Sequence, residues 1–228
     1  MKKVHLLTLI ALIMLGLSGC EKAKVTNQAS ADVFVKSIKN TQGITVYAAI
    51  HSVFSYNVMK SVSVTSPGGT TMQLSDFGAG GLSFYNEPAD ADYTAIPPTA
   101  GTYTYLVKFN DGEEITYTNS LSSSTLEPAI ITSLAKTTAG DSVYIAWNAI
   151  ANIHGYQLKI MRGTTQIYYS DPFSDSANKP SLRLGFYVPN LTANGTGTFT
   201  FYVNGLLYET TDYVNLQAIS TSTKDIAL

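Results

Sequence analysis

The chain has 228 residues, a length that suits one large domain or two small ones. Its 14 basic and 16 acidic residues give a net charge of −2, so it lacks the basic surface that nucleic-acid binding requires. Charged residues make up only 13% of the chain, whereas 11% are aromatic and 15 residues are tyrosine. This composition favours β-strands, on whose pleated surfaces aromatic and β-branched side chains pack well.

Residues 1–19 have the pattern of an export signal. Two lysines, Lys2 and Lys3, precede an apolar run from residue 6 to residue 17. This run is too short to cross a bilayer, because a transmembrane helix needs about 20 apolar residues. Small residues then lead to Cys20, the only cysteine of the chain. We therefore predict that residues 1–19 direct export and are removed.

The segment Leu17-Ser18-Gly19-Cys20 resembles the lipobox of bacterial lipoproteins. The resemblance implies cleavage before Cys20, a lipid on its thiol and acylation of the new amino terminus. Several acyl chains, at about 0.8 kcal/mol per buried methylene, hold a protein stably on a membrane. The alternative is an ordinary secretory signal with a chance cysteine, which would leave an unpaired thiol in an exported protein. We expect an outer-membrane lipoprotein, at the periplasmic face or at the cell surface.

Residues 20–30 are polar and lack apolar periodicity, so we predict a flexible tether that reaches at most roughly 35 Å. Short alternating segments fill residues 31–125 and indicate β-strands. An Asp-Gly pair within residues 110–113 predicts a hairpin between two of these strands. The alternation is clearest just before it, at Tyr103, Tyr105, Val107 and Phe109.

Residues 126–228 continue in the same style, after a polar stretch that ends in Pro128. No window after the signal has a helical period. Each half offers about seven strands in roughly 100 residues, which is the spacing of β-sandwiches. We therefore predict an all-β chain with two tandem sandwiches, residues 31–125 and 126–228. The alternation in the second half is clearest at Val143, Ile145 and Trp147, at Tyr156, Leu158 and Ile160, and at Phe199, Phe201 and Val203.

A family resemblance supports this architecture. The segment Gly101–Tyr105 resembles the tyrosine corner of immunoglobulin-like domains, with Tyr103 at the corner and Tyr105 where a disulfide cysteine would stand. The early strands of the second half resemble a fibronectin type III domain whose core tryptophan is Trp147, although Phe199 stands where its corner would prefer tyrosine. Tandem domains behind a lipobox are similar to small envelope lipoproteins of Bacteroidetes.

Catalytic patterns are weak. Gly140-Asp141-Ser142 resembles the start of an esterase motif, but the downstream Asp-x-x-His is missing, so a turn is the better interpretation. After the signal the only histidines are His51 and His154, which fall in different predicted domains. A histidine-based triad or zinc site within one domain is therefore not expected. We predict a protein that is not an enzyme and has no cofactor and no metal centre.

Two carboxylate pairs leave one question open. Asp90 and Asp92 flank an alanine in a predicted loop, and Glu113 and Glu114 follow the hairpin turn. Calcium binds six to eight oxygen atoms, often from several carboxylates, so either pair could contribute to a calcium site. Two carboxylates in a loop are more often simply solvated.

The best candidates for ligand binding are Tyr168 and Tyr169. They are adjacent, so on a strand one of the two must face outward. Exposed tyrosine stacks on sugar rings and anchors protein interfaces. We expect a lipid-anchored, non-catalytic envelope protein that binds a protein or cell-surface partner in adhesion or a structural role. The alternative is a glycan-binding accessory lipoprotein that uses exposed tyrosines, and a hydrolase is the least supported class.

Overall fold

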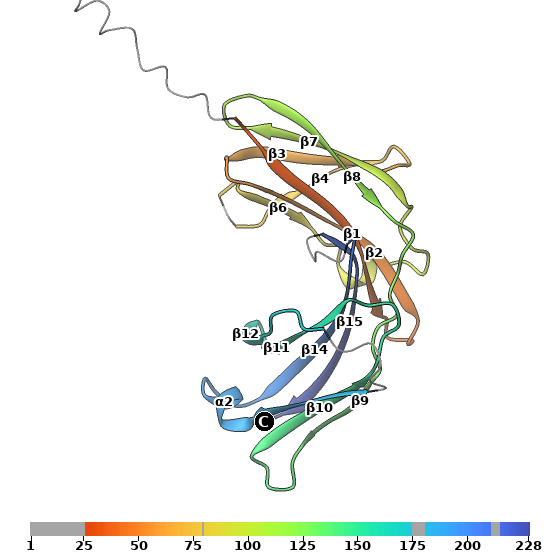
Figure 1. The fold of residues 1–228 in the computed structure, drawn as a ribbon. Helices are drawn as coiled ribbons and strands as arrows, with labels where there is room; N and C mark the ends of the chain where they lie inside the picture. The colour runs from red at the N-terminus through yellow and green to blue at the C-terminus, as the bar shows by residue number, and fades with distance from the viewer. Residues whose placement is uncertain (1–25, 79, 175–180, 211–214) are drawn as a thin grey trace, which may run out of the picture.

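The computed structural model describes residues 26–228 except residue 79 and the segments 175–180 and 211–214. The predicted signal peptide and Cys20 lie outside the described residues. The described chain is all-β and forms two β-sandwiches of the immunoglobulin and fibronectin type III kind, as predicted (Figure 1).

The first sandwich has the Greek-key strand order of immunoglobulin-like domains. One sheet has the order β1-β2-β6-β5 and the other β4-β3-β7-β8, which correspond to A-B-E-D and C′-C-F-G. A short 3-10 helix, η1, lies between β6 and β7. The elements are β1 (Ala29–Lys39), β2 (Thr45–Ser55), β3 (Met59–Thr65), β4 (Thr71–Gln73), β5 (Ser75–Asp76), β6 (Ser83–Asn86), η1 (Asp90–Asp92), β7 (Gly101–Phe109) and β8 (Glu114–Leu121).

The second sandwich repeats this order, with no strand D among the residues that the structure describes. The sheet β13-β10-β9 corresponds to E-B-A, and β12-β11-β14-β15 corresponds to C′-C-F-G. One short helix, α2, was not predicted; it begins at Val188, and Pro189 suits its first turn. The elements are β9 (Ile131–Lys136), β10 (Ser142–Asn148), β11 (Gly155–Arg162), β12 (Thr165–Tyr169), β13 (Ser181–Tyr187), α2 (Val188–Thr192), β14 (Thr198–Tyr208) and β15 (Leu216–Ala227).

The two sandwiches share one sheet. Strand β15 pairs in parallel with β1, from Val35 opposite Ala218 to Ile38 opposite Thr221. This pairing joins strands of both sandwiches into an eight-stranded sheet of order β12-β11-β14-β15-β1-β2-β6-β5. Strands from the two sides of the predicted division after residue 125 are therefore hydrogen-bonded to each other within one sheet.

The shared sheet is curved, and both smaller sheets cover its convex face. Directly paired residues share a face. Val35 lies in the first core, and its partner Ala218 on β15 lies on the same side of the sheet. Ser222 shares that face of β15 and pairs with Val203 of the second core, so both cores lie on one side of the shared sheet. The result is a C-shaped molecule whose concave face is formed by the shared sheet (Figure 1), with the chain around η1 folded over its β2 part.

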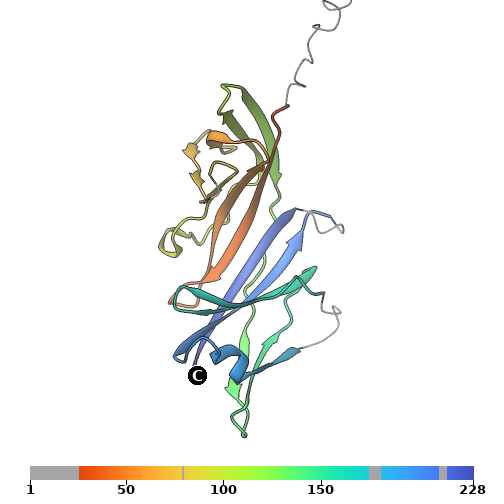
Figure 2. The same cartoon turned by 90° about the vertical axis from the view of Figure 1, so that its left-hand side faces the viewer.

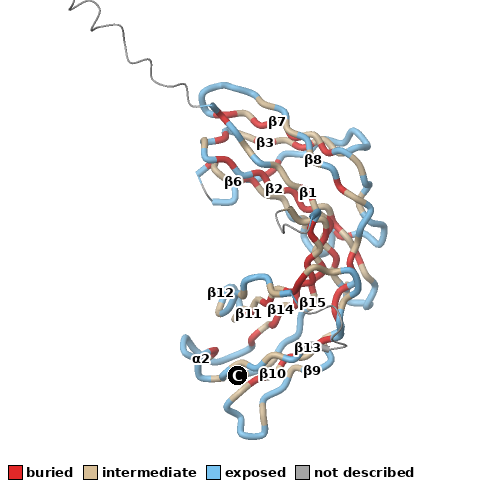
Figure 3. The backbone as a smooth tube through the Cα atoms, in the orientation of Figure 1, coloured by how far each residue is buried: buried red, intermediate tan, exposed pale blue. Residues whose placement is uncertain are grey.

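The buried side chains follow the predicted alternation. The four alternating residues from Tyr103 to Phe109 are buried in the first core, and Val143, Ile145 and Trp147 are buried in the second (Figure 3). The tyrosine corner is confirmed, because the Tyr103 hydroxyl donates to the carbonyl oxygen of Thr99 at 3.1 Å.

Tyr105 replaces a disulfide with hydrogen bonds. Its hydroxyl lies 2.9 Å from Nδ1 of His51 on the facing sheet, and it donates to the carbonyl oxygen of Asp32 at 3.0 Å. Since a phenol has one proton, His51 Nδ1 must carry the hydrogen that the Tyr105 oxygen accepts. Both side chains are almost completely buried, so the pair joins the two sheets through the centre of the core.

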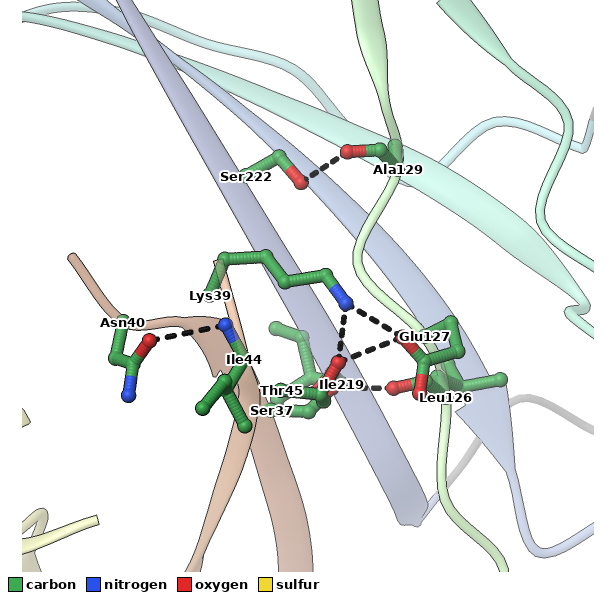
Figure 4. Close-up of polar contacts among 10 residues, drawn as sticks. All are labelled: Ser37, Lys39, Asn40, Ile44, Thr45, Leu126, Glu127, Ala129, Ile219 and Ser222. Atoms are coloured by element: carbon green, nitrogen blue, oxygen red, sulfur yellow. Dashed lines mark hydrogen bonds and ion pairs between the residues drawn. The ribbon is translucent and has the colours of Figure 1, made fainter. Parts of the chain in front are cut away.

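The segment between β8 and β9 runs along the convex side where the sandwiches meet (Figure 1), and its polar contacts are drawn in Figure 4. Leu126 and Ala129 are buried in the first and second core respectively. The buried Ser37 hydroxyl donates to the Leu126 carbonyl at 2.5 Å, and Ser222 Oγ donates to the Ala129 carbonyl at 2.6 Å. Glu127 accepts hydrogen bonds from β1 and β2 side chains. The connection is therefore a fixed part of the interface.

Order begins earlier than the predicted tether end. Ala29 and Ser30 already belong to β1, and the side chain of Asn27 is buried. The Asn27 amide donates to Asp111 at 2.7 Å and to Glu113 at 2.8 Å. These two carboxylates hold the incoming chain against the β7–β8 hairpin.

Candidate functional site

The concave face carries side chains from both sandwiches. On β1, Phe34 and Lys36 alternate with the core residues Val33 and Val35 and therefore point to the concave side. The same alternation places every second residue of β15, β14, β11 and β12 on this side. One sheet thus presents a continuous row of side chains across both halves of the chain.

A row of aromatic and basic side chains crosses the lower half of this face. Register pairs Tyr169 with Lys159 and Lys159 with Tyr202 on three neighbouring strands. The Lys159 Nζ lies 4.3 Å from the centre of the Tyr202 ring, a cation–π contact. Burial, together with repulsion from Lys36, lowers the pKa of Lys159. Tyr169 is 54% exposed at the outer end of the row, where a ligand can reach its ring.

Glu87 organises the upper half of the face. Its carboxylate is ion-paired with Lys36 and accepts hydrogen bonds from the hydroxyls of Tyr85 at 2.7 Å and Tyr93 at 3.2 Å. Burial alone would raise the pKa of Glu87, but these hydrogen bonds outweigh it and hold the pKa below its ordinary value. Glu87 is therefore ionised, and its donors fix its position.

A small third core supports this cluster. The chain around η1 folds over β2, where Tyr93 packs against Val46, Ala48 and Ile50. Backbone hydrogen bonds of 2.7 and 3.0 Å between residues 47 and 94 hold the two segments together. The cluster is thus mounted on a rigid layer.

A cavity of about 550 Å³ lies between the two sandwiches, where β1 and β15 cease to pair beyond Thr221, and side chains from both faces of the sheet line it. Strand β1, η1, the β8–β9 connection, β14 and β15 all contribute to its walls. Its charged lining residues are Lys36, Lys39, Lys224 and Asp90. Lys36 and Lys39 form ion pairs with Glu87 and Glu127 respectively. Such a wall of ammonium groups beside the Tyr202 ring suits a ligand that offers hydrogen-bond acceptors together with apolar surface.

One edge of β15 borders this cavity. Strand β15 pairs with β1 only as far as Thr221, yet it continues to Ala227 along β14. Within the described residues, no strand pairs with β15 on the β1 side beyond Thr221. Backbone groups of a sheet edge can hydrogen-bond to an extended partner segment.

The two predicted tyrosines lie on opposite faces of β12. Tyr169 belongs to the concave row, whereas Tyr168 pairs with Ile160 on the convex side. The Tyr168 ring lies edge-on to Phe186, with 5.3 Å between ring centres. Tyr168, Phe186 and Tyr187 line a second cavity of about 380 Å³, which we call the convex cavity. The structure therefore separates the predicted pair into two different sites.

The serine and histidine candidates from the sequence, Ser142, His51 and His154, lie in turns or in hydrogen bonds that support the fold. Ser142 follows a turn in which Thr137 donates to Asp141 at 2.8 Å, as the turn interpretation predicted. His51 is buried against Tyr105, and His154 Nδ1 accepts the backbone N–H of Tyr208 at 3.1 Å in the other sandwich.

Asp90 and Asp92 both lie in η1, and the carboxylates of Glu113 and Glu114 bind different partners. Glu113 binds Asn27, whereas the neighbouring Glu114 forms an ion pair of 2.7 Å with Lys108. In the parts of the chain that the structure describes, no group of three or more His, Cys, Asp or Glu residues is arranged to hold a metal ion. The helices within those parts are too short or too polar to cross a membrane.

Sequence reasoning identified Tyr169 but missed Lys36, Glu87, Lys159 and Tyr202. Each of these residues lies in a strand or directly after one, as many other polar residues of the chain do, so its position in the sequence does not distinguish it. Their proximity depends on the register of strands far apart in the sequence, which no local pattern contains. The adjacency of two tyrosines was the single local signal.

No protein-family model matches the chain, and no curated protein is similar to it in sequence. Among solved structures, the chicken CNTN1 FN1–FN3 domains are 13% identical over 86% of this chain and 65% of theirs, with a TM-score of 0.31. A two-domain fibronectin type III segment of chicken tenascin is 12% identical over 89% of this chain and 100% of its own, with a TM-score of 0.29. A tetra-tandem repeat from the extending region of a large adhesion protein is 12% identical over 86% of this chain and 49% of its own, with a TM-score of 0.31. These TM-scores are low, and the fold assignment rests on the strand order above.

Proposed function

We propose that this chain is a non-catalytic, lipid-anchored envelope protein that binds a protein or cell-surface partner on the concave face of its shared sheet. The observation that carries the proposal is the row Tyr169–Lys159–Tyr202, which continues across the interface between sandwiches to Lys36 and Glu87. Aromatic rings and cationic groups on a rigid sheet are suited to partner recognition. The lipid anchor at Cys20 rests on the lipobox alone.

The anchor and the membrane face can be tested on cells. Wild-type protein should fractionate with membranes, whereas Cys20→Ala should not. Protease treatment of intact cells then distinguishes the faces: degradation of the wild type places it on the outer surface, and protection until the outer membrane is opened places it in the periplasm. Equal membrane fractionation of Cys20→Ala and wild type would refute the anchor.

The binding face can be tested by attachment. Cells that carry the full-length protein are applied to immobilised extracellular proteins and polysaccharides. The variants Tyr169→Ala and Tyr202→Ala should lose attachment several-fold, whereas Tyr187→Ala, which alters an equally exposed tyrosine at the convex cavity, should retain it. Attachment that persists in both concave variants would refute the proposal.

A glycan-binding accessory role is the second candidate, and the convex cavity favours it. Tyr168, Phe186 and Tyr187 line this cavity with aromatic rings, which stack on the apolar faces of sugars. In that case the protein is retarded on polysaccharide affinity gels, and Tyr168→Ala abolishes the retardation while Tyr202→Ala preserves it. Absence of retardation with every polysaccharide tested would remove this candidate.

A further inference from the structure

Exposed apolar side chains gather at the free end of the first sandwich. Tyr56 is 90% exposed, Phe77 70%, Phe54 46% and Val58 42%. The rings of Phe54 and Tyr56 are in edge-to-face contact, with 5.0 Å between their centres. We refer to Phe54, Tyr56, Val58 and Phe77 as the end patch.

Hydrogen bonds hold the end patch together. The turn from β2 to β3 contacts the turn from β5 to β6 through Ser55 N–H to Leu82 O at 2.9 Å and Met59 N–H to Gly81 O at 2.8 Å. Gly81 has a φ of +84°, and a Cβ there would lie 2.6 Å from the Met59 carbonyl oxygen. This close approach requires glycine, and it holds Gly81 and Leu82 directly against the turn from β2 to β3.

Phe54 and Phe77 lie on the same face of this end. Phe54 is opposite Ser83 on β6, and the backbone N–H of Phe77 donates to the Ser83 carbonyl from the other side at 2.9 Å. The two aromatic residues are thus about two strand spacings apart, roughly 10 Å, with only a serine between them. Tyr56 adds a third ring beyond the end of β2.

The chain enters the first sandwich beside the end patch. Ala29 pairs with Ser55, the residue before Tyr56, and Ser55 Oγ donates to the Gln28 carbonyl at 2.6 Å. The buried Asn27 is fixed to the neighbouring hairpin. Strand β1 begins at this end of the molecule, while the carboxyl terminus lies toward the other (Figures 1 and 2).

The length of chain before this point limits the distance to the proposed anchor. Six peptide steps separate Cys20 from Thr26, the first described residue, and they extend to at most roughly 20 Å. A lipid on Cys20 therefore keeps the end patch close to the bilayer in any conformation of that segment. The opposite sandwich lies farther away along the molecule.

The chemistry of the patch matches the membrane interface. Tyrosine and phenylalanine partition into the headgroup region, where one side is apolar and the other wet. Three carboxylates lie beside the patch and disfavour contact with strongly anionic lipid. Asp76 accepts the backbone N–H of Gly81 at 3.0 Å, and Asp111 and Glu113 accept hydrogen bonds from the Asn27 amide. A zwitterionic bilayer is therefore the expected partner.

We propose that the end patch inserts into the interface of the same bilayer that holds the lipidated Cys20, so that the protein stands on its first sandwich. This inference rests on the proposed lipid anchor. A partner protein or a second copy of the chain on the end patch are the competing occupants. Bilayer contact fixes the orientation of the molecule, which an extended tether by itself does not.

The test uses the full-length lipidated protein in phosphatidylcholine vesicles. A tryptophan is introduced as Tyr56→Trp, and its fluorescence is measured with and without brominated acyl chains in the bilayer. The matched control is Tyr169→Trp, which alters an exposed tyrosine of the far sandwich. The natural Trp147 is fully buried, and its signal in the wild type is subtracted from both.

Bromolipid should quench Tyr56→Trp several-fold more strongly than Tyr169→Trp and shift its emission to the blue. Adding Phe54→Ser and Phe77→Ser should reduce that quenching while the protein still floats with the vesicles. Equal quenching at the two positions in floating protein would overturn the inference, and so would blue-shifted emission that depends on protein concentration and ignores bromolipid, since a second copy then covers the patch. Wild-type protein that fails to float would refute the anchor instead, so the two failures are distinguishable.

Discussion

Burial of His51 makes the stability of the first sandwich sensitive to acid. Burial lowers the pKa of His51 from its ordinary 6.5 to about 4. The unfolded chain therefore binds a proton near pH 6.5 that the folded chain accepts only near pH 4. Stability from this residue is fully present above 6.5 and is lost as the pH falls toward 4. At about 1.4 kcal/mol per pH unit, the loss reaches roughly 3 kcal/mol.

The variant His51→Asn isolates this effect. The asparagine amide nitrogen can occupy the position of the ring Nδ1 and keep the hydrogen bond to Tyr105, but it does not titrate. The variant should be less stable at neutral pH, because the smaller side chain leaves space in the core. Its unfolding free energy should nevertheless lack the loss that the wild type shows between pH 6.5 and about 4.

Asp32 changes the stability with pH in the opposite direction to His51, so its contribution has to be removed from the comparison. Burial and the nearby Glu209 raise the pKa of Asp32 to about 6. Its contribution to stability is greatest at low pH and is lost as the pH rises through 6. Because the wild type and His51→Asn both contain Asp32, the difference between their unfolding free energies removes this contribution.

The assay is urea unfolding of the full-length protein at a series of pH values, followed by Trp147 fluorescence and by circular dichroism. The difference between wild type and His51→Asn should shrink steadily as the pH falls. A difference that stays constant over this range would refute the reasoning, since His51 would then titrate alike in the folded and unfolded chain.

Three further predictions concern the core and the interface. Removing the corner hydroxyl with Tyr103→Phe should cost about 1 kcal/mol, and Trp147 fluorescence should report the same midpoint shift as circular dichroism because one sheet joins both sandwiches; two separate transitions would contradict this. Ser37→Ala, which leaves the buried Leu126 carbonyl without its donor, should lower the unfolding free energy by about 1–3 kcal/mol in urea titrations. Glu127→Ala removes an exposed ion pair with Lys39 and an exposed hydrogen bond from Thr45, and it should cost less than about 1 kcal/mol by the same measurement.

Local pattern was sufficient for the sandwiches. The alternation from Tyr103 to Phe109 predicted a strand with one buried face, because a strand places successive side chains on opposite sides. The Asp-Gly turn and the tyrosine corner were also readable, since each depends on a few neighbouring residues. Helix α2, of five residues from Val188 to Thr192, is too short for a helical period to appear.

The shared sheet and the concave site needed the structure. The pairing of Val35 with Ala218 joins the two ends of the chain, and no periodicity identifies which strand edges meet. The same holds for Lys36 and Glu87, which come together only through the fold of β2 and β6. Adjacent tyrosines were noticed in the sequence, but which of them faces the concave side depends on the register of β12.

The parallel pairing of β1 with β15 has a consequence for how the chain matures. Ser37 and Ile219 lie 182 positions apart, so the edge of β1 that pairs with β15 stays open until β15 has been synthesised. An open edge invites pairing with other chains, and charged residues such as Asp32, Lys36 and Lys39 along β1 discourage it during that interval. A truncation that removes the 12 residues of β15 would make this interval permanent. Pairing with β15 thus closes the open edge of β1, and termination of synthesis before β15 would yield aggregation rather than a shortened working protein.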